Sequence, residues 1–357
     1  MHVFISNRWK LIAILSLISV VAGAVLVFNS YYKSVPANRV QLPPSLTRTD
    51  TVTWLGANQL LVGNSEVFWY QSTPGGHWQL LPLPPDPQCL RVYYHNVLLL
   101  ADGRLGMIKM CTGHIDPSTG FDFTASLIAY DWQTHQVNPL IPRKLPNTGE
   151  FTWNTALQRG VFTPIGNYST LYWLLPGGVE PVPIMLRKGL RSWYLPDTIT
   201  ALAKYQAAPG QVGRQPKQIG MARDPAWSPT EDKIAFWATL ETIGQSDAFP
   251  VVPWDIYLLN PNTLTTERLL SDVMDPARLV WSPNGRWLAY CSGSDWRKPR
   301  GIWLFSLDQR RSLLVQRGHF FDLAWSPDGN TLAATQCFDA TCSQSAVWTY
   351  DIRGLVQ

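Results

Sequence analysis

The chain has 357 residues, of which 46% are apolar, 12% aromatic and 15% charged. This much apolar surface with so little charge excludes an intrinsically disordered chain, and a net charge of +4 is too small to indicate a nucleic-acid partner. The 17 Trp, 28 Pro and 25 Gly residues favour many short strands and turns over long helices. We therefore expect a β-rich globular protein.

The first predicted element is an uncharged run at residues 11–28, preceded by Arg8 and Lys10. As a helix its 18 residues span about 27 Å, close to the thickness of a bilayer core. An uncleaved transmembrane anchor is favoured over a cleaved signal peptide, whose nearest cleavage site would be at residues 35–37. The preceding basic residues place residues 1–10 in the cytoplasm. We expect a single-pass protein of the cell membrane, with everything after residue 30 outside the cytoplasm.

The cysteines fit such a location. Cys337 and Cys342 bracket a short loop, and Cys89 and Cys111 flank two predicted strands, so each pair is a disulfide candidate. Cys291 would then be unpaired. The alternative is that all five are small buried hydrophobic residues.

A repeated hairpin organises the C-terminal half of the chain. Three segments have the form of an apolar run ending in Trp, then Ser-Pro, a polar turn and a second apolar strand, and they begin at Ala226, Val280 and Ala324. Their Trp residues are 54 and 44 residues apart, which is typical of a four-stranded propeller blade. Upstream copies at Val52 and Phe151 keep the Trp and lose the Ser-Pro. In the second copy we expect Tyr93 or Tyr94 in place of Trp.

A second recurrent element follows each hairpin, with six copies such as DIYLLN at Asp255 and GIWLFS at Gly301. Because one small sheet cannot bury both its faces alone, the copies must stack around an axis. The sequence predicts an all-β six-bladed β-propeller over residues 49–357, preceded by a linker at residues 29–48. Its repeated Trp rings should fill the space between blades, namely Trp54, Trp153, Trp227, Trp281 and Trp325.

The last blade supplies only three strands of its own. Residues 38–42 are apolar at alternate positions, and we expect them to pair with the strand at residues 346–351 and close the ring.

The Trp-Ser-Pro-Asp-Gly hairpin followed by Asp-Ile-Tyr resembles the repeats of TolB-type propellers, which also occur in propeller domains of prolyl-oligopeptidase-like proteins. The resemblance is specific over about residues 222–351 and weak over residues 49–186. It implies a six-bladed propeller, which agrees with the repeat count, but it implies no function, because that architecture hosts binding proteins and enzymes alike.

One segment fits no blade. Residues 187–222 form an insertion rich in Gly, Gln, Pro and basic residues. It is either a solvated loop or a contact surface for a partner or for lipid headgroups. The residues of this possible contact surface are Arg187, Lys188, Arg191, Lys204, Arg214 and Lys217.

A search for catalytic and metal-binding motifs finds none, so we assign no catalytic, cofactor-binding or metal-ligating residue and expect no cofactor. His114 and Asp116 come closest to a reactive cluster, although a turn is the better interpretation. Asp255, Asp322 and Asp351 are expected to bond turns or neighbouring strands. Asn167 begins the one Asn-x-Ser sequon.

Two functions remain. The first is a membrane-tethered, extracytoplasmic, non-enzymatic binding module or accessory subunit, with a protein partner whose identity the sequence does not give. The second is a propeller hydrolase or lyase with a site at the axial funnel. Enzymatic activity is therefore uncertain, and its absence is favoured. Three or more convergent acid, His or Asn side chains at one mouth of the axis would reverse this order.

Overall fold

The computed structural model describes residues 35–71, 76–113, 123–142, 145, 148–164, 171–174, 182–184, 221–239, 253–293, 300–339 and 342–356. Within this part of the chain, no helix is long and apolar enough to span a membrane. The predicted anchor at residues 11–28, His114 with Asp116, the sequon at Asn167 and the basic residues of the insertion all lie outside the described residues.

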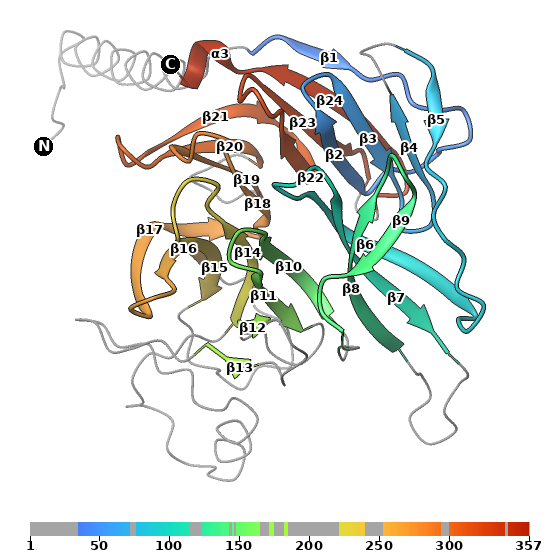
Figure 1. Cartoon of the computed structure of the whole chain (residues 1–357). Coiled ribbons are helices and arrows are strands. Elements are labelled where there is room, and N and C mark those ends of the chain that lie inside the picture. The colour runs from blue at the N-terminus through green and yellow to red at the C-terminus, as the bar shows by residue number, and fades with distance from the viewer. Residues whose placement is uncertain are drawn as a thin grey trace, which may run out of the picture.

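The described residues form six four-stranded antiparallel sheets arranged around a central axis (Figure 1), so the predicted six-bladed propeller is confirmed. In each sheet the strands follow one another in chain order, and the last sheet alone borrows a strand from the start of the chain. The first strands of neighbouring blades lie side by side at the axis.

The strands of the first three blades have the following bounds. Blade 1 consists of β2 (Thr51–Gly56), β3 (Gln59–Gly63), β4 (Phe68–Gln71) and β5 (Trp78–Leu80). Blade 2 consists of β6 (Arg91–Leu99), β7 (Leu105–Thr112), β8 (Phe123–Asp131) and β9 (Gln136–Pro139). Blade 3 consists of β10 (Thr148–Asn154), β11 (Arg159–Pro164), β12 (Tyr172–Leu174) and β13 (Val182–Pro183).

Blades 4 and 5 have longer outer strands than the other four blades. Blade 4 consists of β14 (Met221–Trp227), β15 (Ile234–Thr239), β16 (Pro253–Asn260) and β17 (Thr265–Met274). Blade 5 consists of β18 (Ala277–Trp281), β19 (Trp287–Ser292), β20 (Gly301–Ser306) and β21 (Arg311–Arg317). Blade 6 consists of β22 (His319–Trp325), β23 (Thr331–Cys337), β24 (Ser345–Asp351) and β1 (Ala37–Arg39), and the short helix α3 (Arg353–Val356) follows it.

The serine of each clear Trp-Ser-Pro segment fastens its hairpin. The Ser282 hydroxyl accepts a hydrogen bond from the Trp287 amide at 3.0 Å and donates one to Asn284 Oδ1 at 2.7 Å. Ser326 repeats this arrangement one blade later. Gly285 has a φ of 70°, which a glycine adopts without strain, so the Asn-Gly pair closes the tight turn as the sequence predicts.

The five repeated Trp rings are buried, as predicted, with exposed fractions of 7–9%. Each packs against the preceding blade: Trp325 contacts the core around Leu304 of blade 5, and Trp54 contacts Ala333 and Val347 of blade 6. The Trp281 ring nitrogen also donates to the Ala226 carbonyl of blade 4 at 2.9 Å. The rings therefore hold neighbouring blades together.

The assignment of Tyr93 or Tyr94 to the Trp position of blade 2 is wrong. Leu99 pairs with Leu105 immediately before the hairpin turn, where the other blades place their Trp. Strand β6 is nine residues long and contains a bulge between His95 and Leu98, so its two tyrosines lie nearer the start of the strand than the sequence spacing suggests.

The ring closes through β1, which pairs antiparallel with β24. The register joins Ala37 to Tyr350 and Arg39 to Trp348, and the Val40 amide donates to the Val347 carbonyl at 2.9 Å. The predicted closure is thus confirmed, with a strand one residue nearer the N-terminus and two residues shorter than expected.

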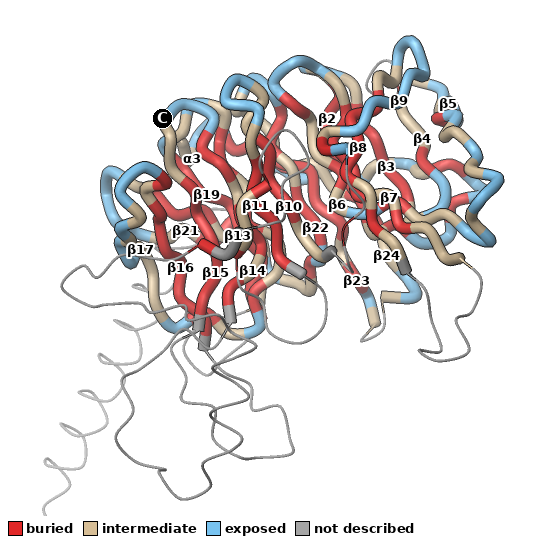
Figure 2. The backbone as a smooth tube through the Cα atoms, turned by 60° about the horizontal axis from the view of Figure 1, so that its bottom comes forward, coloured by how far each residue is buried: buried red, intermediate tan, exposed pale blue. Residues whose placement is uncertain are grey.

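The N-terminal side of β1 lies on the same rim as the hairpin turns. The Pro36 carbonyl accepts from the Asp351 amide, and the next amide, that of Ile352, donates to Asn330 in the hairpin of blade 6. Figure 2 shows α3 and the C-terminus on the rim that carries many exposed turns. The chain therefore enters and leaves the propeller on its hairpin rim.

Candidate functional site

The candidate site lies at the axis, where the first strands of the six blades meet. Five of these strands place a polar side chain three residues before the repeated Trp: Thr51, Glu150, Asp224, Arg278 and Asp322. In blade 2, Asn96 stands three residues before Leu99, which replaces the Trp. The same register position therefore brings six polar side chains toward one axis.

Backbone bulges turn several of these residues inward. The strand pairing shifts between Arg223 and Ala226 and again between Ala277 and Leu279. Asn96, Asp224 and Arg278 have φ values of 49°, 55° and 35°, in the left-handed region that is strained for an Arg side chain. Strained residues of this kind gather at functional sites, where the surrounding structure holds them in place.

Above these three residues lies a funnel of about 780 Å³ that opens on the hairpin rim. Asn96, Asp224 and Arg278 are the polar groups of its floor. Its wall is mostly apolar and includes all five repeated Trp residues together with Pro225, Pro229, Pro283 and Pro327. A concave, mainly apolar site with a few convergent polar groups is typical of a ligand pocket.

The floor is held by Arg278. Its Nη1 atom donates to Asn96 Oδ1 at 2.8 Å, and its Nε atom lies 3.0 Å from Asp322 Oδ1. Asn96 in turn donates from Nδ2 to the Phe151 carbonyl at 3.2 Å, and Asp322 Oδ2 accepts from the Val52 amide at 2.9 Å. Two side chains thus hold the guanidinium, and each of them is held in turn by a main-chain group.

Asp224 has no such partner. It is 8% exposed, and within the described part of the chain its carboxylate accepts no hydrogen bond. Burial and then the Glu150 charge raise its pKa to about 7, against the opposing effect of the Arg278 and Arg223 charges. Burial also raises the pKa of Asp322, which Arg278 partly offsets. Asp224 is therefore a buried acid that can gain or lose a proton near neutral pH.

The two cysteine pairs singled out in the sequence are disulfides in the structure, Cys89–Cys111 and Cys337–Cys342. Both lie away from the funnel lining. Cys291 is a buried free thiol whose pKa burial raises well above the usual value.

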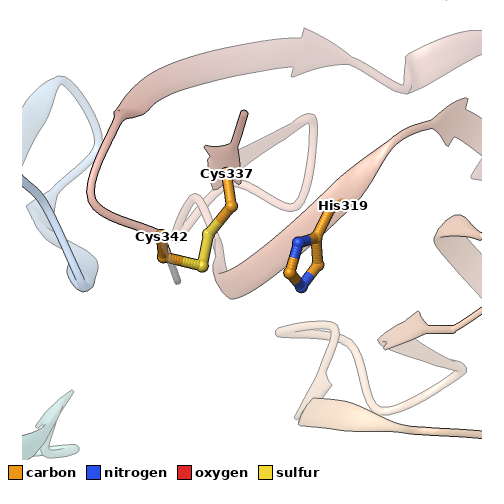
Figure 3. A group of neighbouring side chains, drawn as sticks. All are labelled: His319, Cys337 and Cys342. Carbon is orange, nitrogen blue, oxygen red and sulfur yellow. A yellow bond between two sulfur atoms is a disulfide. The ribbon is translucent and has the colours of Figure 1, made fainter. Parts of the chain in front are cut away.

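A second group of side chains has the spacing of a metal site. His319 lies beside the Cys337–Cys342 disulfide (Figure 3), with one candidate ligand atom from each residue within 4.8 Å of the others. Because the two sulfur atoms are bonded to each other, neither is a thiolate that could bind a metal. Burial, and then Arg300, lowers the pKa of His319. The group is thus a disulfide with an imidazole beside it.

The axial residues were missed in the sequence, apart from Asp322. Asp322 bonds a neighbouring strand through the Val52 amide, as predicted, but the sequence does not indicate its place at the axis. The other axial residues could be identified from one pattern in the sequence. The residue three positions before each hairpin Trp is polar in all five copies. Asp255 does bond a neighbouring strand, since it accepts from the Asp272 amide at 3.1 Å.

No protein-family model matches the chain, and no curated protein matches it either. Among solved structures, the chain is similar to a calcium-binding protein, regucalcin, from Agrobacterium tumefaciens, with 9% identity, 89% of this chain and 94% of that chain covered, and a TM-score of 0.51. A luciferin-regenerating enzyme gives 12% identity, 90% and 96% coverage and a TM-score of 0.50.

TolB from Acinetobacter baumannii is also among the similar structures, with 14% identity, 82% of this chain and 57% of that chain covered, and a TM-score of 0.48. At these identities the likenesses show the six-bladed fold alone, which both binding proteins and enzymes adopt.

Proposed function

We propose that this protein is a binding module, tethered to the outer side of the cell membrane, that holds a partner in its axial funnel. The observation that carries the proposal is the floor of the funnel. Asp224 is buried there with no hydrogen bond from any described residue, beside an Asn96–Arg278 pair that is fixed by hydrogen bonds, under a cavity of about 780 Å³. A buried polar group left unpaired costs free energy, so a bound group that pairs with it is favoured.

The proposed tether is the apolar segment at residues 11–28, for which the sequence is the support. Six residues separate Phe28 from Val35, the first described residue, which reach at most about 20 Å when extended. Because the chain enters the propeller on the hairpin rim, the tether would keep the funnel mouth close to the bilayer. The two disulfides favour an oxidising compartment for the propeller. We therefore propose a partner that is itself membrane-bound or lies at the membrane surface.

The topology is tested by protease treatment of intact, wall-stripped cells that carry a tag at residue 1. We expect the propeller to be digested or released while the tag stays protected. A propeller that stays protected in sealed cells would exclude the proposed orientation.

The funnel is tested by cross-linking the full-length protein in its native membranes. We expect cross-linking to join this protein covalently to its partner. Ala156 is an exposed residue of the funnel rim, and Ala156→Trp should narrow the mouth of the funnel and abolish this cross-linked species. Gln309→Trp adds the same side chain at an exposed outer turn that does not line the funnel. It should leave the cross-linked species unchanged, and equal loss in both variants would count against the funnel as the binding site.

A second candidate is a hydrolase or lyase acting in the same funnel. It is favoured by the convergence of Asn96, Glu150, Asp224 and Asp322 on the axis and by the pKa of Asp224 near 7, which suits a general acid or base. These four side chains reach the number that would favour an enzyme, but Asn96 and Asp322 are bonded to Arg278, and Glu150 is bonded to Thr163. Asp224 alone is uncommitted among these four described residues, so we keep the binding module as the first candidate. An enzyme would show turnover on a panel of ester, glycoside and lactone substrates, and Asp224→Asn would abolish it.

A further inference from the structure

The charges of the axial cluster do not balance. Its acids are Glu150, Asp224 and Asp322, and its bases are Arg223 and Arg278. Arg278 pairs with Asp322 at 3.0 Å. The Arg223 guanidinium is engaged elsewhere, since it donates to the Pro276 carbonyl and stacks at 4.5 Å from the centre of the Trp254 ring.

The remaining acids differ in their surroundings. Glu150 accepts a hydrogen bond from the Thr163 hydroxyl at 2.5 Å, whereas Asp224 lines the funnel with no such bond among the described residues. The other two acids of the funnel wall already have partners: Asp232 pairs with Arg159 at 2.8 Å, and Glu231 pairs with Lys233. Asp224 is thus the one carboxylate among the described funnel-lining residues with neither an ion pair nor a hydrogen bond.

We propose that the funnel takes a singly charged organic cation, the side chain of a lysine or arginine on a partner protein, with the Asp224 carboxylate as its counter-ion. This inference rests on the proposed function, in which the funnel is where the partner binds. A primary ammonium or guanidinium group would supply the positive charge that the cluster lacks and the hydrogen-bond donors that Asp224 lacks.

The wall of the funnel suits an organic cation. Five Trp residues line it, and indole rings attract ammonium and guanidinium groups. The protein itself uses this pairing next to the funnel, where the Arg159 guanidinium lies 5.3 Å from the Trp227 ring centre and 5.5 Å from that of Trp173.

A divalent metal ion fits the site less well. Calcium takes six to eight oxygen ligands, and magnesium requires an octahedral set. At the floor, Asn96 Oδ1 is already bonded to Arg278, so only the two oxygens of Asp224 are uncommitted among the described floor residues. The positive charge of Arg278 beside them also repels a divalent ion about twice as strongly as a singly charged ammonium or guanidinium group.

Binding of a cation at Asp224 should depend on pH, because the ionised carboxylate attracts it and the neutral form does not. The charged groups that act on Asp224 are Glu150 and Asp322, which favour its neutral form, and Arg278 and Arg223, which favour its ionised form. A cation binds the ionised form, whose population rises roughly tenfold between pH 6 and pH 8 for a pKa of about 7. The affinity for an ammonium group, which stays charged over this range, should rise by roughly the same factor.

The test is calorimetric titration of the full-length protein in detergent with Nα-acetyl-lysine methylamide at pH 6 and pH 8. The neutral comparison is the same compound acetylated on the side-chain amine. We expect the charged compound to bind at least about tenfold more tightly, and more tightly at pH 8 than at pH 6. Equal binding of the two compounds would overturn the proposal without any variant.

Substitutions of Asp224 test whether its carboxylate is the group that binds the cation. Asp224→Asn should reduce the affinity at pH 8 about tenfold or more, whereas Asp224→Glu should retain charge-dependent binding. Asp308→Asn removes an exposed carboxylate on an outer turn and should change nothing. Unchanged affinity in Asp224→Asn, or tighter binding of calcium chloride than of the lysine compound, would overturn the assignment.

Two further comparisons test whether the cation comes from a protein, and distinguish failure of the cation inference from failure of the proposed binding function. n-Butylammonium presents the same group without a peptide, and binding tighter than that of the lysine compound would overturn a protein side chain as the source. If neither amine binds while Ala156→Trp still abolishes cross-linking, the cation inference fails and the proposed binding function stands.

Discussion

Arg278 and Asp322 form an ion pair across blades 5 and 6, with Nε 3.0 Å from Oδ1 and both side chains at least four-fifths buried. The second oxygen of Asp322 accepts from the Val52 amide of blade 1. This one carboxylate therefore connects the last blade to both of its neighbours at the axis. The junction that closes the ring is thus fixed on the inside by Asp322 and on the outside by β1.

Removing both partners of this pair should cost less than the sum of removing each partner alone. Arg278→Met leaves Asp322 buried with no counter-charge and should lower the free energy of unfolding by about 3–5 kcal/mol. The double variant Arg278→Met with Asp322→Asn should lose less than the two single variants together. Urea unfolding followed by Trp fluorescence measures each. Arg286→Met, in the exposed pair with Asp308, is the control and should cost under about 1 kcal/mol. A loss in Arg278→Met no larger than in this control would contradict the prediction.

The two disulfides should contribute unequally because they close loops of different length. Cys89–Cys111 spans 22 residues of sequence and Cys337–Cys342 spans five. The chain-entropy relation gives about 3 kcal/mol for the longer loop and about 2 kcal/mol for the shorter. We expect the Cys89→Ser, Cys111→Ser variant to unfold at a lower urea concentration than the Cys337→Ser, Cys342→Ser variant. The reverse order would show that loop length does not govern their contributions.

The fold could be predicted from the sequence because its signals are local. Asn284-Gly285, the Ser-Pro steps and the apolar alternation each specify a hairpin within about ten residues. The number of copies then gives the number of blades. The register of blade 2 could not be predicted in this way, because the bulge before Leu98 shifts the pairing without a Gly or Pro to mark it.

The candidate site could not be predicted from the sequence, for a different reason. Asn96, Asp224 and Arg278 are more than 50 residues apart in sequence, and each alone is a polar residue in a strand. Only the closed ring brings Arg278 within 2.8 Å of Asn96 and places Asp224 in the lining of the same funnel. The residue type also differs from blade to blade, so a repeat search that looks for identity passes over the position.

The stability of the protein should depend on pH through Asp224. Its pKa is about 7 in the folded state and 3.8 ordinarily, so between these values the folded state holds a proton that the unfolded state releases. The stabilisation from protonated Asp224 is therefore complete below pH 4, falls as the pH rises toward 7, and changes no further above it.

Asp224→Asn imitates the protonated form at every pH, so it should gain stability relative to the natural protein as the pH rises. The gain between pH 5 and pH 7 should be on the order of 2 kcal/mol. Urea midpoints of both proteins at pH 5, 6, 7 and 8 measure it, with Asp308→Asn to show the effect of losing an exposed carboxylate. A difference between Asp224→Asn and the natural protein that does not vary with pH would contradict the raised pKa.

The closing strand offers the last prediction. Val40→Pro removes the amide that donates to the Val347 carbonyl at 2.9 Å and should lower the free energy of unfolding by about 1–3 kcal/mol. Val40→Thr keeps the amide and the branched shape and serves as the matched control. A thermal midpoint of Val40→Pro equal to that of Val40→Thr would contradict a stabilising role for this bond.

The folding and unfolding rates should show whether β1 pairs with β24 before or after the folding transition state. The contact between Val40 and Val347 joins segments about 300 residues apart, and such contacts form late because closing a long loop costs entropy before any contact repays it. A contact that is absent from the folding transition state changes the unfolding rate and leaves the folding rate nearly unchanged. We therefore expect Val40→Pro to accelerate unfolding in urea by about five- to a hundredfold, with refolding slowed less than twofold. Stopped-flow Trp fluorescence measures both rates. If refolding slows as much as unfolding accelerates, the two termini already meet in the transition state, and the ring closes early.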